Sequence, residues 1–135
     1  MRARDRLGRF VDPDSADAVE PVGEAPLPPY DAVALARQLL ADGRPFSAHE
    51  VFEASWKAAA GPERDLWQGL AQICVGLTHL QRRNAVGAAT LLRRGAGRLA
   101  QATADYGVDP RQIAADALQL AGAVEQGASE GTVVI

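Results

Sequence analysis

The chain has 135 residues, of which 47% are hydrophobic and 5% aromatic, and its formal net charge is −3. This length suits one domain with its own hydrophobic core, and abundant Ala, Leu and Arg favour helices over strands. The single cysteine, Cys74, excludes an intrachain disulfide and a cage of thiolate metal ligands. No stretch approaches the roughly 18 uninterrupted apolar residues of a membrane span. Because the chain also starts without an apolar signal segment, we expect a cytoplasmic protein without a membrane partner.

Both ends of the chain lack a sustained hydrophobic period. In residues 1–29, charges of both signs alternate with five prolines, which is typical of a disordered or extended leader. We expect residues 128–135 to be a flexible tail. The sequence between them, residues 30–127, is predicted to be the folded domain.

This central part predicts five helices, because apolar residues recur at helical spacing between proline and glycine stops. Gly43 and Gly107 end helices, while Asn84 and Asp109 are suited to cap the starts of two others. Short connections between helices favour a compact antiparallel bundle, so the predicted fold class is all-α. The predicted helices cover roughly residues 30–42, 45–60, 62–82, 84–104 and 110–126.

The third predicted helix is apolar around most of its circumference, which is typical of a central buried helix. Its polar residues Gln68, Gln72 and His79 fall close to one line, because their spacing completes nearly whole turns. Polar side chains on a buried helix need hydrogen-bond partners. Five glycines within the third and fourth helices predict close helix–helix approach, and these are Gly69, Gly76, Gly87, Gly95 and Gly97.

The second predicted helix supplies candidate partners for this polar stripe. His49 and Glu53 are four residues apart and project from one face, with Glu50 at its shoulder and Trp56 one turn further on. A short antiparallel connection is expected to bring this face against the polar stripe of the third helix. The sequence therefore predicts one polar cluster inside an apolar bundle.

The same residues carry a family resemblance. His49, Glu53 and Trp56 form an HxxxExxW pattern, followed by the sequence ERDLWQGL from Glu63 and NAVGA from Asn84. Over about residues 31–100 the chain resembles the family known as domain of unknown function 309. The resemblance implies an all-α fold and a suggested metal-binding role for the three motif residues, with no established activity.

Three interpretations of the cluster stay open. His49, Glu53 and His79 form a ligand set for zinc, iron or manganese, with Glu50 as a general base on a bound water. Alternatively, the cluster is a hydrogen-bonded packing network in a non-enzymatic structural or interaction module. The third interpretation is binding of a small ligand or partner, which includes a second copy of this chain. In each case the supporting residues are Gln68, Gln72 and Trp56.

Residues 62–100 form the basic part of the chain, with six arginines and only two acidic residues. Arginines in such a run usually form a solvated face, and an anion-binding or nucleic-acid-binding surface is the functional alternative. Aromatic residues do not interleave with them, so nucleic acid is the less favoured ligand. The candidate anion-binding residues are Arg82, Arg83, Arg93, Arg94 and Arg98.

Overall fold

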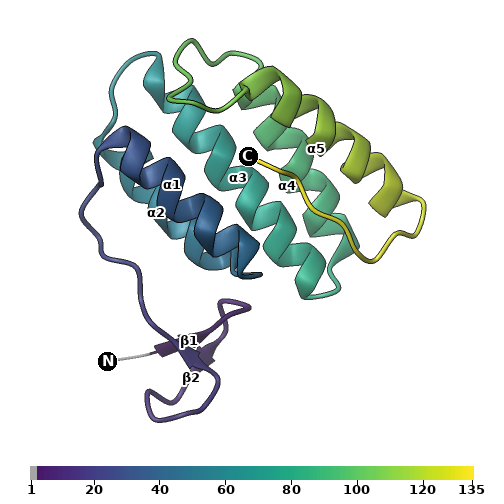
Figure 1. The fold of residues 1–135 in the computed structure, drawn as a ribbon. Helices are drawn as coiled ribbons and strands as arrows, with labels where there is room; N and C mark the ends of the chain where they lie inside the picture. Colours follow the sequence, from purple (N-terminus) through teal and green to yellow (C-terminus); the bar gives the residue numbers. More distant parts are fainter. Residues whose placement is uncertain (1–2) are drawn as a thin grey trace.

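The computed structural model describes residues 3–135 and confirms the all-α helical bundle (Figure 1). Three short strands precede the helices: β1 (Ala3–Asp5), β2 (Phe10–Val11) and β3 (Ala18–Val19). The five helices are α1 (Pro29–Ala41), α2 (Pro45–Ala58), α3 (Glu63–Gln81), α4 (Ala85–Leu99) and α5 (Pro110–Glu125).

Proline and capping residues start these helices where the sequence predicts. The side chain of Asn84 accepts a hydrogen bond from the backbone N–H of Gly87 at 3.0 Å, and Asp109 accepts one from Gln112 at 3.1 Å. Both predicted caps are therefore confirmed. Gly43, with φ of +72°, supplies the left-handed backbone that ends the first helix and leads into the second.

Helix α3 lies between α2 and α4, and α5 packs on the far side of α4 (Figure 1). Leu66, Leu70 and Ile73 of α3 are fully buried, which confirms the prediction of a central helix. Each helix packs mainly on its neighbours in sequence, as short connections require. Among residues 3–135 no helix is both long and apolar enough to cross a membrane.

Glycines bring α3 and α4 into close approach. A Cβ atom added at Gly95 would lie 2.9 Å from the backbone oxygen of Gly69, and one at Gly69 would lie 2.8 Å from Leu99. Gly76 is equally close to Leu92 of α4, at 2.9 Å. The packing role predicted for the helical glycines is confirmed at these three positions. Gly97 is different, because nothing lies within 4 Å of the Cβ position there.

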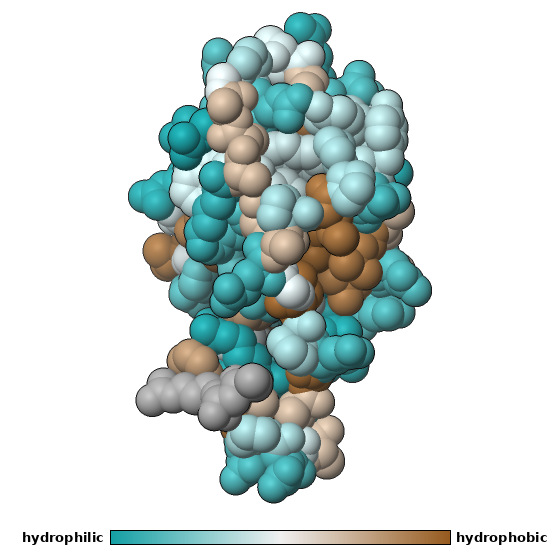
Figure 2. All heavy atoms as spheres, turned by 90° about the vertical axis from the view of Figure 1, so that its left-hand side faces the viewer, coloured by the Kyte–Doolittle hydropathy of each residue, from teal (hydrophilic) through white to brown (hydrophobic). Residues whose placement is uncertain are grey.

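The N-terminal segment differs from the expected disordered or extended leader, because its strands form an antiparallel sheet in the order β2-β1-β3. Turn hydrogen bonds hold it: Asp5 Oδ1 accepts the backbone N–H groups of Leu7 at 3.0 Å and Arg9 at 2.8 Å. Arg82 Nε, at the end of α3, donates to the Leu7 carbonyl at 2.8 Å. Such short strands leave no hydrophobic period to detect. Figure 2 shows the sheet projecting from the bundle, below an apolar area among mostly polar atoms.

Two boundaries near the C-terminal half also differ from expectation. Helix α4 ends at Leu99 rather than near Ala104, because the chain turns to stack the Tyr106 ring on Trp67, with ring centres 5.6 Å apart. The segment expected to be a flexible tail lies against the bundle. Val133 is buried there, and Arg37 Nε donates to the Ile135 backbone oxygen at 2.8 Å.

Candidate functional site

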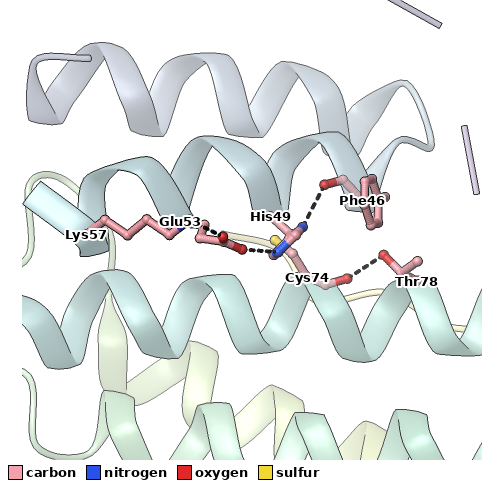
Figure 3. A network of polar contacts seen from close by, with 6 residues as sticks. All are labelled: Phe46, His49, Glu53, Lys57, Cys74 and Thr78. Carbon is pink, nitrogen blue, oxygen red and sulfur yellow. Dashed lines mark hydrogen bonds and ion pairs between the residues drawn. The ribbon is translucent and has the colours of Figure 1, made fainter. Parts of the chain in front are cut away.

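Two of the predicted site residues, His49 and Glu53, form a row with Phe46 and Lys57 along one face of α2 (Figure 3). His49 Nε2 lies 2.7 Å from Glu53 Oε2, and the other oxygen of Glu53 lies 2.8 Å from Lys57 Nζ. His49 Nδ1 lies 3.1 Å from the backbone oxygen of Phe46. The side chain of His49 is 16% exposed and that of Glu53 34%. The His49–Glu53 pair is therefore partly buried, and its hydrogen-bond and ion-pair partners among residues 3–135 all come from α2 itself.

These contacts involve both ring nitrogens of His49 and both carboxyl oxygens of Glu53. The hydrogen bond from Lys57, together with the charge of His49, holds the pKa of Glu53 below its ordinary value, so Glu53 is a carboxylate at neutral pH. Both nitrogens of the imidazole then face oxygens that only accept hydrogen bonds. A ring nitrogen that carries a proton donates it to the oxygen that it faces.

Glu50, the predicted general base, is a neighbour of this row and not a member of it. Burial raises its pKa, while the charges of His49 and Arg4 oppose that shift. Within residues 3–135, Glu50 forms no hydrogen bond or ion pair.

In the polar stripe of α3, His79 and Gln72 lie toward α4 and the turn before it. The expectation that they face α2 is therefore wrong. His79 Nδ1 accepts a hydrogen bond from Asn84 Nδ2 at 3.2 Å, in the turn that leads into α4. Gln72 lines a surface hollow together with Arg94 of α4. Burial, with a smaller effect of the Arg82 charge, lowers the pKa of His79. A central helix has two neighbours, and periodicity alone does not tell which one a stripe will meet.

The proposed metal ligands are consequently not brought together. In the described part of the chain, no group of three or more His, Cys, Asp or Glu side chains could hold a metal ion. His49 is paired with Glu53, whereas His79 is paired with Asn84. The residues present therefore do not fit the metal centre that the family resemblance suggests.

The predicted supporting residues do not join the row either. The Arg64 guanidinium lies 5.5 Å from the centre of the Trp56 ring, and the Trp56 Nε1 atom is buried without a hydrogen-bond partner. Gln68 forms no hydrogen bond within residues 3–135. Neither His49 nor Glu53 lines any of five surface hollows on residues 3–135. The row thus lies apart from these five hollows.

The five arginines of the predicted anion-binding surface have separate roles. Arg93 pairs with Glu125 of α5, and Arg98 pairs with Asp65 of α3 at 3.2 Å. The other three differ in their surroundings: Arg82 holds the N-terminal sheet, Arg83 turns the chain between α3 and α4 with φ of +62°, and Arg94 lines the hollow beside Gln72.

Sequence reasoning missed the residues that complete this hollow. Asp65 of α3 and Gln101, just beyond α4, contribute to its walls, and Gly97 leaves it open. The available signal is the spacing of Arg94, Gly97, Arg98 and Gln101, which places them on one helical face.

Comparison with protein families gives one match. Residues 33–91 match the model of the family described as domain of unknown function (DUF309). The match starts inside α1, contains all of α2 and α3, and ends inside α4. It therefore includes the His49–Glu53 pair. Neither the curated proteins nor the solved structures gave a match.

Proposed function

We propose, from the premise that residues 33–91 belong to the DUF309 family, that this protein is a non-enzymatic helical module. In this module, the His49–Glu53 pair stabilises the helical conformation of α2. The observation that carries this proposal is that both ring nitrogens of His49 and both oxygens of Glu53 have partners on α2.

The position of the pair supports a structural role. Partly buried hydrogen bonds to a charged group, here the Glu53 carboxylate, contribute about 1.5–3 kcal/mol, because they form where water competes less well. His49 also packs against the Phe46 ring, with ring centres 5.1 Å apart. A rigid α2 would in turn hold its apolar side in register with α3.

The test measures metal content and stability in the same samples. We expect untagged protein to contain no stoichiometric zinc, iron or manganese after incubation with excess ion. His49→Ala should lower the free energy of unfolding by about 1–3 kcal/mol, equally with and without zinc. Urea unfolding followed by circular dichroism gives this value. Elemental analysis that finds near-stoichiometric metal, lost in His49→Ala but kept in His79→Ala, would overturn the proposal.

We place this module in the cytoplasm. Cys74 is a fully buried free thiol, and burial raises its pKa, so it is suited to a small apolar packing role and not to reaction. A free cysteine is compatible with a reducing compartment. Cell fractionation that recovers the native chain outside the cytoplasm would contradict this assignment.

A further inference from the structure

A polar hollow of about 350 Å³ opens between α3 and α4, away from the His49–Glu53 pair. Two residues from α3 and four from α4 and the turn after it form its walls. The four residues of α4 and its following turn are spaced so that they share one helical face. The two residues of α3 lie two turns apart on that helix. The lining residues are Asp65, Gln72, Arg94, Gly97, Arg98 and Gln101.

One wall of the hollow carries a polar atom without a partner. Gln72 Oε1 is buried and accepts no hydrogen bond. Buried polar atoms in folded proteins nearly always have a partner, so an orphaned acceptor on a side chain that lines an open space would gain one by turning toward a donor there. The other amide atom of Gln72 is a donor, so this one side chain can both give and receive a hydrogen bond there.

The hollow also carries positive charge. Arg94 is exposed and forms no ion pair within residues 3–135, and it lies one turn before Arg98. The Arg98 guanidinium is held by Asp65 Oδ1 at 3.2 Å, which fixes its position at the rim. Gly97 between them adds no side chain, so a ligand can approach the helix surface. Two guanidinium groups one turn apart suit an oxyanion with several oxygens.

We propose that this hollow binds a phosphate group that keeps one protonated oxygen, as hydrogen phosphate does. Arg94 and Arg98 donate to the charged oxygens of the ligand. Its P–OH group donates to the Asp65 carboxylate, or to Gln72 Oε1 once that side chain turns into the hollow. Sulfate has the same shape but no proton at neutral pH, so it would leave the acceptor unpaired and face a carboxylate as well. The site therefore selects phosphate over sulfate, and it is independent of the function proposed for His49 and Glu53.

Calorimetric titration of the full chain at neutral pH and low salt tests this selection. Inorganic phosphate should bind at one site with a Kd below about 1 mM, and sulfate at least tenfold more weakly. Glycerol phosphate and dimethyl phosphate identify the source of the group. Because a monoester has lost most of its P–OH proton at neutral pH, its titration is repeated at about pH 5.5, where binding as tight as that of inorganic phosphate points to a phosphorylated metabolite. The diester should bind weakly because it has no P–OH.

Three variants test which residues bind the phosphate group. Arg94→Gln should weaken phosphate binding about tenfold or more. The matched control, Arg93→Gln, removes a neighbouring arginine that pairs with Glu125 and should change the Kd by less than about twofold. Gln72→Leu should bring phosphate and sulfate affinities close together. Circular dichroism checks that each variant is folded.

Several outcomes would overturn the proposal. These are no saturable binding up to about 10 mM phosphate, equal binding of sulfate, or equal losses in the Arg93 and Arg94 variants. Single-stranded RNA that binds with a steep salt dependence, spread over all the arginines, would also replace the small-anion site by a nucleic-acid surface.

Discussion

The two interfaces of the central helix are built in different ways. Between α2 and α3, bulky rings fill the space, and Phe52 stacks on Trp67 with ring centres 6.1 Å apart. Between α3 and α4, glycines let the backbones approach, and Gly95 faces Gly69 directly. The first interface packs ring against ring, whereas in the second the glycines lie against backbone atoms and against the leucine side chains of α4. One helix therefore presents a large-residue face and a small-residue face at once.

The largest effect is expected from removing a ring at the α2–α3 interface. Phe52→Ala deletes a fully buried side chain and leaves a cavity against Trp67. We expect the free energy of unfolding to fall by about 3–5 kcal/mol. Val86→Ala, at an 80% exposed position, should change it by less than about 0.5 kcal/mol. Urea unfolding of both variants measures the difference, and similar values would mean that this interface does not dominate stability.

A smaller effect is expected from adding one methyl group at the α3–α4 interface. Gly95→Ala places a Cβ 2.9 Å from the Gly69 backbone oxygen, which cannot rotate away. We expect a loss of about 1–3 kcal/mol, although alanine is the better helix former. Gly97→Ala is the matched control, because it adds the same methyl group where nothing lies within 4 Å. It should raise stability by up to about 1 kcal/mol. A thermal unfolding series in which both substitutions stabilise would show that the helices separate easily.

The smallest effect is expected from pH, at the end of the α3–α4 interface. Burial lowers the pKa of His79, so the unfolded chain takes up a proton at higher pH than the folded chain does. The contribution of His79 is complete above its ordinary pKa of about 6.5 and is lost as pH falls toward the lower folded value. Wild type should therefore lose more stability than His79→Gln between about pH 7.5 and 5.5. Urea unfolding at each pH gives the free energy of unfolding of both proteins. If this free energy falls equally in wild type and in His79→Gln, the burial of His79 has no effect on stability.

Local signals in the sequence predicted most of the fold. The caps Asn84 and Asp109 and the stop at Gly43 act through neighbours in the chain, so their roles can be read from short segments. The apolar circumference of α3 likewise predicted its central place. The ends were harder, because the N-terminal sheet depends on turn hydrogen bonds and on an arginine far along the chain.

The candidate site was predicted only in part. His49 and Glu53 are one turn apart, so their contact follows from helix geometry. The partner of His79 depends on how α3 is rotated about its axis between α2 and α4. In the structure this partner is Asn84, in the turn that follows α3. Rotation is set by the large rings on one side and the glycines on the other, which a hydrophobic period does not distinguish.

The order in which the helices pack has a consequence for folding kinetics. Because each helix contacts mainly the next one in sequence, most native contacts close short loops, and such low contact order is typical of folding in microseconds to milliseconds. The contacts that secure the chain ends span 75 residues, from Arg82 to Leu7, and 98 residues, from Arg37 to Ile135. These loops cost the most entropy to close, so the N-terminal sheet and the C-terminal segment should dock last. Their amide protons should accordingly exchange with solvent faster than those of α3.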